Sequence, residues 1–256
     1  WPPSKEQLKI ANCLVKEQLD AGHIQPFVSP WNTPIFVVPK KTGKGRILQD
    51  LRKVNNQMWP MGALQPGLPL LTMLPRGWHL LVIDLKDCFF NIPLHPEDTA
   101  RFAFTIPSVN KSEPAKHYEW VVLPQGMKNS PTICQMYVAW ALSPIHKEMP
   151  ETLIYHYMDD ILFCQEAPFP DNFSQILTNR LKTKGLIVAP EKVQTRLPWS
   201  YLGWQVTHAM VRPQKLEVIS SIKTLNNAQK LVGELRWVRP IIGLTNADIH
   251  PFLSLL

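Results

Sequence analysis

Three aspartates with apolar surroundings carry the strongest chemical signal in this sequence. Asp159 and Asp160 interrupt the apolar stretch 153–164, and Asp84 ends the apolar run 79–84. Two neighbouring carboxylates at the edge of a core raise each other's pKa, so a bound cation most easily keeps both ionised. Hard cations such as Mg²⁺ take oxygen ligands. The ordinary alternative is a solvated turn, because aspartate tolerates turn conformations and favours contact with water. The apolar flanks argue against that alternative.

The separation of these aspartates along the chain raises the question of whether they meet. If the run 79–84 lies beside the hairpin predicted at 153–164, Asp84 and Asp159 converge on one edge of a sheet. Three carboxylates could then hold two Mg²⁺ ions about 3.5–4 Å apart, as in two-metal phosphoryl-transfer sites. The alternative for Asp84 is a structural role as the cap that ends its strand. Asp87, three residues later, is a further acid near this position, and we interpret it as the N-cap of a short helical turn and not as a metal ligand. The sequence does not establish the adjacency.

The elements that must position these residues follow from the hydrophobic periodicity. Residues 4–21 carry apolar residues at helical spacing, with Ser4 as N-cap and Gly22 as terminator. Residues 35–38 and 46–51 flank a basic, glycine-containing turn, which predicts a hairpin with a lysine-rich tip. Further strands are predicted at 101–107, 117–123, 201–206 and 210–213, and further helices at 131–142, 171–184 and 226–238.

The order of these elements predicts an α+β protein, because strands and helices are mixed without a regular βαβ repeat. A domain boundary is expected at 213–225, after the last predicted hairpin. Twenty-five prolines against eleven glycines indicate many interrupted elements and not a bundle of long helices.

The composition favours a folded chain with a polyanionic partner. The 256 residues are 45% hydrophobic and carry a formal net charge of +7. That balance argues against disorder and favours nucleic acid before a membrane surface. No apolar run reaches about 18 residues, so no membrane span is expected.

The cysteines and the chain ends carry weaker signals. The four cysteines form no CxxC pair, which favours reduced, mostly buried thiols over a zinc site or a disulfide framework; they are Cys13, Cys88, Cys134 and Cys164. The N-terminus shows no signal-peptide pattern. Because the chain opens at Trp1 and stops in an apolar stretch, we expect it to be part of a longer polypeptide.

Six segments in a fixed order resemble retroviral reverse transcriptases. The polymerase motifs are matched by YMDD with its apolar flanks, by IDLKDCFFNIPL and by LPQGMKNSPTICQ. KKTGKGRILQDLRKVN resembles the fingers hairpin of that family, YLGWQV its primer grip, and LVGELRWVRPIIG its first thumb helix. The sequence LPQGM…SPTICQ and the Trp-Pro dipeptide at the start of the chain look most like the betaretroviral branch of this family, including endogenous elements.

The resemblance implies a right-hand polymerase fold of the α+β class. It would have an antiparallel palm sheet packed on helices, β-hairpin fingers and a truncated helical thumb. The expected fingers are residues 1–60 and 101–125, and the expected palm is residues 61–100 and 126–213. The YMDD and primer-grip hairpins would lie in palm residues 126–213. A partial thumb is expected at 214–256. No connection or ribonuclease H domain is expected within this chain.

The resemblance also implies roles for the residues at the motif positions. Asp84, Asp159 and Asp160 would bind two Mg²⁺ ions, with Mn²⁺ as a substitute, and carry catalysis. Lys41 and Arg46 would clamp the phosphates of the incoming dNTP, since lysine supplies a point charge and arginine a planar fork. The remaining dNTP-binding positions are Asp87, Cys88, Phe89, Gln125 and Met158. Of these, Phe89 would exclude a 2′-hydroxyl, Gln125 would lie beside the nucleotide, and Met158 beside the primer end.

Primer and template would be held mainly through their phosphates. The matching positions are Tyr157, Gly203, Trp204, Gly233 and Trp237. Trp237 fits a place in the core equally well, because it stands at helical spacing from apolar residues, whereas Phe90 is expected in the core. Lys192 is a candidate general acid for pyrophosphate, which Val193 puts in doubt because some relatives have a second lysine there.

The predicted function is therefore RNA- and DNA-templated DNA synthesis. Its partners would be an RNA or DNA template with a primer, and dNTPs, with no membrane; monomer and dimer both stay open. A viral chain would act in the virion and the host cytoplasm. The alternatives are an endogenous remnant that binds nucleic acid without catalysis, and an RNA-dependent RNA polymerase. Phe89 argues against the latter, and the intact acids argue against the former.

Overall fold

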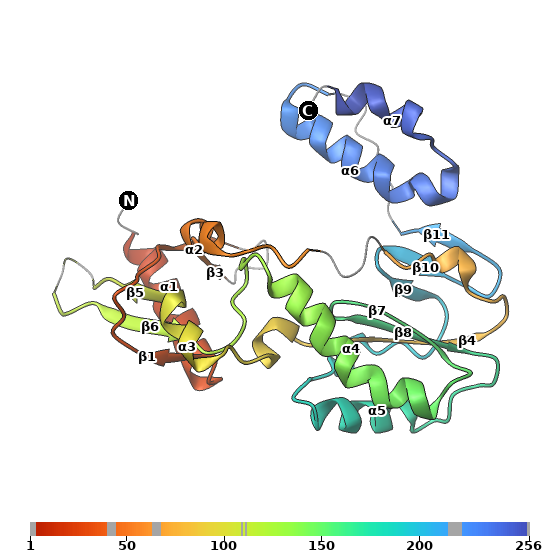
Figure 1. Ribbon diagram of the computed structural model, residues 1–256, viewed down its shortest axis with the longest axis horizontal. Coiled ribbons are helices and arrows are strands. Elements are labelled where there is room, and N and C mark those ends of the chain that lie inside the picture. The colour runs from red at the N-terminus through yellow and green to blue at the C-terminus, as the bar shows by residue number, and fades with distance from the viewer. Residues whose placement is uncertain are drawn as a thin grey trace. The chain divides into compact units, whose positions relative to one another are not determined.

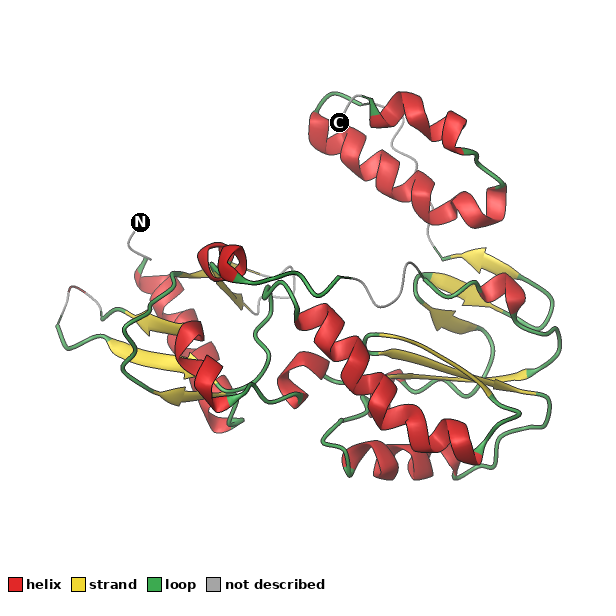
Figure 2. Ribbon diagram, viewed as in Figure 1, coloured by secondary structure: helices red, strands yellow, loops and turns green. Residues whose placement is uncertain are grey.

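The computed structural model describes residues 4–39, 45–62, 68–108, 110, 112–214 and 222–254. The chain forms two compact units, whose elements are labelled in Figure 1. The first unit comprises Trp1–Pro66, Leu85–Pro144 and Leu177–Val188, and the second comprises Gly67–Asp84, Ile145–Ile176 and Ala189–Leu256. Both units contain helices and strands (Figure 2), and all pairings between the named strands are antiparallel. The predicted mixture of helices with antiparallel sheets is confirmed.

The first unit opens with the helix predicted at 4–21. Helix α1 (Lys5–Asp20) begins at Ser4, whose side chain accepts a hydrogen bond from the Gln7 N–H in a capping box. Leu8, Ala11 and Val15 form its buried stripe, as a 3.6-residue period requires.

Two antiparallel sheets follow in this unit. Strands β1 (Ile24–Pro26), β5 (Ala103–Ile106) and β6 (Lys116–Trp120) form one sheet in the order β1-β6-β5. Strands β2 (Ile35–Pro39) and β3 (Gly45–Gln49) form the predicted hairpin. The basic tip of this hairpin, including Lys41, lies outside the described residues.

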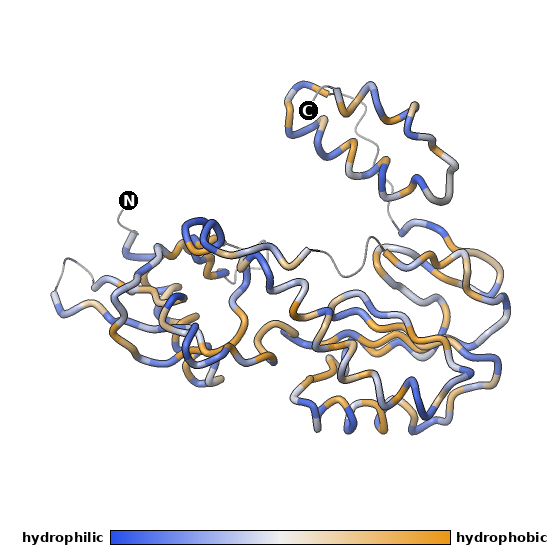
Figure 3. The backbone as a smooth tube through the Cα atoms, viewed as in Figure 1, coloured by the Kyte–Doolittle hydropathy of each residue, from blue (hydrophilic) through white to orange (hydrophobic). Residues whose placement is uncertain are grey.

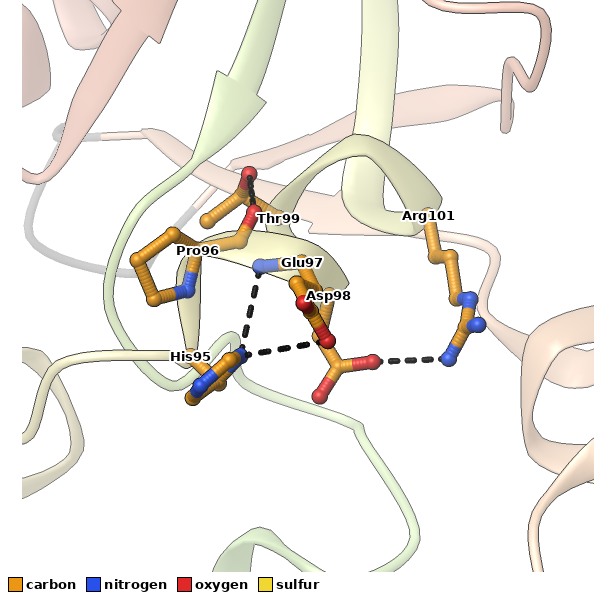
Figure 4. Close-up of polar contacts among 6 residues, drawn as sticks. All are labelled: His95, Pro96, Glu97, Asp98, Thr99 and Arg101. Carbon is orange, nitrogen blue, oxygen red and sulfur yellow. Dashed lines mark hydrogen bonds and ion pairs between the residues drawn. The ribbon is translucent and has the colours of Figure 1, made fainter.

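Short helical turns connect these strands, and of them only the turn after Asp87 was predicted from the sequence. They are α2 (Arg52–Gln57), η2 (Cys88–Asn91), α3 (Pro96–Thr99) and η3 (Ala100–Phe102). Figure 4 shows how α3 is held: the Glu97 N–H donates to His95 Nδ1 at 3.4 Å, and Arg101 pairs with Asp98 at 2.7 Å. Proline at the first helical position and acids in the first turn suit the start of a helix.

Two longer helices confirm the predictions at 131–142 and 171–184. Helix α4 (Ser130–Glu148) is longer than predicted and continues through Pro144. Helix α5 is Phe173–Lys182. The apolar residues that α4 buries are Cys134, Val138, Ala141, Leu142 and Ile145.

The central sheet of the second unit contains the strands predicted at 79–84 and within 153–164. Strands β4 (His79–Asp84), β7 (Leu153–Tyr157) and β8 (Asp160–Gln165) form a sheet in the order β4-β8-β7. Its middle positions are buried on β4 and β8, and hydrophobic stretches of the chain run along this sheet (Figure 3). A short turn, η1 (Leu71–Met73), precedes β4.

A second small sheet corrects one sequence prediction. Strands β9 (Trp199–Tyr201), β10 (Trp204–Val206) and β11 (Val211–Pro213) are ordered β11-β10-β9. The single strand predicted at 201–206 is therefore wrong, because the chain turns at Leu202 and Gly203, where φ is 47° and 81°. The hairpin with 210–213 is confirmed. The turn η5 (Pro190–Lys192) lies before β9 in the sequence.

The C-terminal part is helical, as predicted, but extends further. Helix α6 (Leu225–Ile242) contains the predicted helix 226–238, and α7 (Asn246–Leu253) was not predicted. Among the described residues, no helix combines the length and the apolar character that a membrane span needs. All four cysteines are reduced, and three of them are buried, as expected.

Candidate active site

Strand register brings Asp84 and Asp160 face to face in the second unit. The β4–β8 pairing runs from His79↔Gln165 to Asp84↔Asp160, so both carboxylates stand at the same end of neighbouring strands. Asp159 is in the turn between β7 and β8, next to Met158 at a φ of 54°. The strand adjacency that the sequence left open is confirmed.

Burial and mutual repulsion set the electrostatics of the three aspartates. Loss of solvent raises the pKa of Asp160 to about 6, and the charges of Asp159 and Asp84 add to the rise. The pKa of Asp159 is raised as well, first by burial and then by Asp84. The neighbouring charges thus disfavour ionisation of Asp159 and Asp160, which is the condition under which a bound cation is most stabilising.

Lys192 supplies the positive charge that faces these carboxylates. Its Nζ donates to Asp84 Oδ1 at 2.7 Å, and this contact raises the pKa of the ammonium. The backbone around Lys192 is fixed along β4: the Ala189 N–H donates to the Asp84 carbonyl at 2.8 Å, and the Gln194 N–H to the Val82 carbonyl at 2.9 Å. The lysine that the sequence singled out is therefore held at the aspartates by backbone pairing.

An open cleft of about 440 Å³ joins several predicted residues. Asp84, Asp160, Lys192 and Gly203 all line it, so catalytic, general-acid and primer-binding candidates share one surface. The sequence did not predict the other polar lining residues, which are Glu191, Gln194, Ser200 and Gln214. No motif marks them; the only sequence signal is that Glu191 and Gln194 immediately flank Lys192 and Val193.

The aspartates suit a divalent metal by their chemistry. They offer hard oxygen donors and an excess of negative charge, and an ammonium already binds one of them. As the side chains are oriented, however, no three His, Cys, Asp or Glu residues in the described part of the chain form a group that could hold a metal ion. The strand register and the turn at Asp159 therefore bring the three positions to the same end of the sheet.

The turn between β9 and β10 is covered by α6. A Cβ at Gly203 would lie 2.9 Å from the Trp237 indole, so only glycine fits beneath that ring. The Trp237 and Trp204 rings lie 4.5 Å apart at 31°. Trp237 thus packs against the hydrophobic core of this unit, in agreement with the core alternative. Gly233 on the same helix is exposed, and Tyr157 is half-buried at the end of β7.

Two of the expected nucleotide-binding residues meet in the first unit. The exposed Arg46 guanidinium donates to Gln125 Oε1, which joins β3 to the LPQG segment. Gly126 follows at a φ of 92° with open space where a Cβ would be, as a close backbone approach requires. Asn55 bridges the same segment, since its side chain donates to the Gly126 carbonyl at 2.9 Å.

The turn η2 carries the remaining expected positions of the first unit. Asp87 is its N-cap residue at a φ of 49°, but its side chain makes no capping hydrogen bond. Cys88 is buried with its Sγ 3.0 Å from that of Cys134, so its side chain faces the interior. Phe89 is half-buried. Phe90, which was expected in the core, is half-buried as well and stacks on Trp120 with the ring centroids 5.2 Å apart.

Comparisons with known proteins agree with this arrangement. The family described as reverse transcriptase (RNA-dependent DNA polymerase) matches residues 38–206, and the reverse transcriptase thumb domain matches residues 213–256. The Gag-Pro-Pol polyprotein of Simian retrovirus SRV-2 is 51% identical over 259 aligned residues, which cover all of this chain and 15% of that polyprotein.

Other similar proteins come from a mouse intracisternal A-particle and from a sheep virus. The Pol-related polyprotein of the mouse intracisternal A-particle MIA14 is 50% identical over 253 residues, covering 98% of this chain and 29% of that protein. The Gag-Pro-Pol polyprotein of sheep pulmonary adenomatosis virus is 49% identical over 259 residues, all of this chain and 15% of that polyprotein. The chain thus spans less than a third of the length of each of these relatives. Both the sequence motifs and these matches show that the chain belongs to the reverse transcriptase family, with its similarity in the betaretroviral and intracisternal A-particle branch.

Proposed function

We propose that this chain is an RNA- and DNA-templated DNA polymerase that transfers dNMP from a dNTP to a primer 3′-OH and releases pyrophosphate. The observation that carries the proposal is the pairing of Asp84 with Asp160 across β4 and β8, beside Asp159 and at a cleft shared with Gly203. Membership of the reverse transcriptase family supports a primed template and dNTPs as the partners.

The proposed metal site consists of Asp84, Asp159 and Asp160. The raised pKa values of the two adjacent carboxylates support it, because two bound divalent cations would relieve their repulsion. Bound there, Mg²⁺, or Mn²⁺ in its place, would lower the pKa of the primer hydroxyl and neutralise the departing pyrophosphate. A proton-donating role for Lys192 stays a prediction.

Most of the proposed dNTP-binding residues belong to the first unit. Arg46 and Lys41 would bind the triphosphate, and the Arg46–Gln125 hydrogen bond supports a common site for Arg46 and Gln125. Phe89 would pack beneath the sugar and leave a 2′-hydroxyl without room or a partner. Asp87, Cys88 and Met158 are further proposed dNTP-binding positions; the buried side chain of Cys88 leaves only its backbone for such a contact.

Primer and template would lie along Tyr157, Gly203, Trp204, Gly233 and Trp237. Of these, Gly203 lines the cleft beside Asp84 and Asp160, which supports a role near the primer end. The fingers, palm and thumb ranges predicted from the sequence remain part of this proposal. The retroviral and intracisternal A-particle relatives favour a virion and the host cytoplasm as the places of action.

Primer extension by the purified chain tests the proposal. RNA and DNA templates are each offered with dNTPs or rNTPs, in Mg²⁺ or Mn²⁺. Incorporation of dNTPs on both templates is expected. Faster extension with rNTPs than with dNTPs would identify an RNA polymerase. Binding of the duplex without incorporation of any nucleotide, in Mg²⁺ and in Mn²⁺, would identify a remnant that only binds nucleic acid.

A further inference from the structure

Two thiols from distant parts of the sequence meet inside the first unit. Cys88 belongs to η2 and Cys134 to α4, 46 positions further along the chain, and their Sγ atoms lie 3.0 Å apart. Both side chains are buried, at 4% and 0% exposure, and both are reduced. No sequence pattern marks this contact, because the two residues belong to different motifs.

The separation of the two sulfurs suits a covalent bond between them. A disulfide requires about 2.05 Å between its sulfurs, which is about 1 Å less than the present contact. The alternative is a role in packing alone, because a buried thiol behaves as a small apolar side chain. That alternative predicts no reaction between the two residues.

Burial determines which oxidant could reach the pair. A bulky disulfide such as oxidised glutathione has almost no exposed sulfur surface to attack, whereas hydrogen peroxide is little larger than water. Peroxide would convert one thiol to a sulfenic acid with release of water, and the second sulfur would displace the hydroxyl as another water. Two thiols thus lose two protons and two electrons, and one peroxide becomes two waters. Local opening of η2, a turn of four residues, would give a dithiol reductant access for the reverse exchange.

A disulfide at this place would act on a residue of the proposed nucleotide site. Phe89 lies between Cys88 and Phe90, and the side chains of both neighbours are held. Phe90 stacks on Trp120, and Cys88 contacts Cys134. Because Phe89 has held neighbours on both sides, a displacement of Cys88 toward α4 shifts the ring that would lie beneath the sugar. A misplacement of about 1 Å in a reacting complex can cost about a hundredfold in rate.

We propose that Cys88 and Cys134 are a reversible oxidation site, which forms a disulfide with peroxide and thereby suppresses nucleotide incorporation. The disulfide follows from the contact of the two thiols alone. The loss of incorporation rests on the proposed function, in which Phe89 packs beneath the sugar. A cytoplasm that keeps thiols reduced would hold the pair in its active, dithiol form.

Peptide mapping of the full chain tests the disulfide. The protein is treated with hydrogen peroxide, catalase removes the excess, and the chain is unfolded in N-ethylmaleimide before digestion with trypsin. Cleavage gives peptide 87–101 with Cys88 and peptide 129–147 with Cys134. We expect the two peptides to be joined, two hydrogen atoms lighter than their sum, and to separate after dithiothreitol. Recovery of both cysteines as maleimide adducts, or as separate sulfinic acids, would overturn the proposal.

Single-nucleotide incorporation on the same preparation tests the consequence. Peroxide should lower the wild-type kcat/KM for a dNTP roughly ten- to a hundredfold, with primer–template affinity unchanged, and dithiothreitol should restore it. Cys134→Ala should incorporate dNTP as the wild type does and lose this sensitivity; Cys134→Val serves the same purpose if the alanine variant does not fold. Cys164→Ala is the matched control, because Cys164 is equally buried but lies in the second unit, and it should stay as sensitive as the wild type.

Two results would contradict the regulatory role. One is undiminished incorporation by wild-type protein in which the peptides are joined. The other is equal inhibition of Cys134→Ala, which would place the damage at another residue, such as an oxidised Met158. If the untreated wild type extends no primer, the proposed function fails, while the peptide map still decides whether the disulfide forms.

Discussion

At the residue scale, the chemistry of the second unit depends on where a few charges are placed. Asp84, Asp159 and Asp160 repel one another in a partly desolvated position, and Lys192 is the cation in contact with Asp84. Such a group is unfavourable for stability alone, because removing carboxylates from water costs free energy that one exposed lysine only partly offsets. A bound ligand of opposite charge would offset this cost, as the proposed metal site requires.

Phe89 allows the proposed sugar selectivity to be tested at one residue. Phe89→Val should reduce the preference for dNTPs over rNTPs roughly ten- to a hundredfold, because the smaller side chain makes room for a 2′-hydroxyl. Single-nucleotide incorporation with dNTP and rNTP in parallel measures this ratio. Phe90→Leu is the control, since Phe90 stacks on Trp120 and should leave the ratio unchanged. Unaltered discrimination in Phe89→Val would remove Phe89 from this role.

Part of the candidate site could be predicted from the sequence at this scale. The apolar flanks of Asp84 and of the aspartate doublet indicated positions at the edge of a core, and both stand at the ends of buried strands. The contact between Lys192 and Asp84 could not be derived, because it joins positions 108 residues apart. The orientation of the three carboxylates is equally a result of folding and not of any local pattern.

At the element scale, the turn between β9 and β10 shows how a local backbone conformation can make a prediction from a sequence pattern wrong. YLGWQV alternates as one strand would, yet Leu202 and Gly203 both take positive φ values and reverse the chain. The structure uses that reversal to bring Gly203 under Trp237 of α6. Periodicity carries no information on such a contact between distant elements, whereas it correctly predicted the hairpin of β7 and β8.

Gly203→Ala tests the fit between this turn and α6. A left-handed alanine costs about 1–2 kcal/mol, and the clash with the indole should add about 1 kcal/mol or more. Gly77→Ala is the matched control, because Gly77 has a similar φ of 77° and no atom within 4 Å of the added Cβ. Urea unfolding measures both free energies. Trp237→Leu should cancel the excess loss at Gly203; equal losses at the two glycines would contradict the packing described here.

At the scale of the whole molecule, two compact units share the proposed work. The first holds Arg46, Gln125 and Phe89, and the second holds the three aspartates and Gly203. The chain leaves one unit and enters the other between Asp84 and Leu85, so a single polymerase motif contributes to both. Sequence periodicity predicted most strands and helices, but the division into units depends on long-range packing that periodicity does not encode.

The net charge of +7 leads to a prediction for the complete chain. We expect the protein to neutralise about four to six phosphates of the primer–template. Raising the salt concentration from 50 to 200 mM should then weaken primer–template binding by roughly two to three powers of ten. Electrophoretic or anisotropy titrations at several salt concentrations measure the slope. An affinity that is independent of salt would mean that phosphate contacts do not hold the duplex.

The most direct test of the central claim is primer extension by Asp159→Asn, with duplex binding measured on the same preparation. The variant keeps the shape of the side chain and removes one charge that two metal ions would need. Incorporation of dNTP should fall about a thousandfold while primer–template affinity stays at the wild-type value. Asp171→Asn, at an exposed aspartate of the same unit that does not line the cleft, should extend primers normally. Wild-type incorporation by Asp159→Asn would contradict the account.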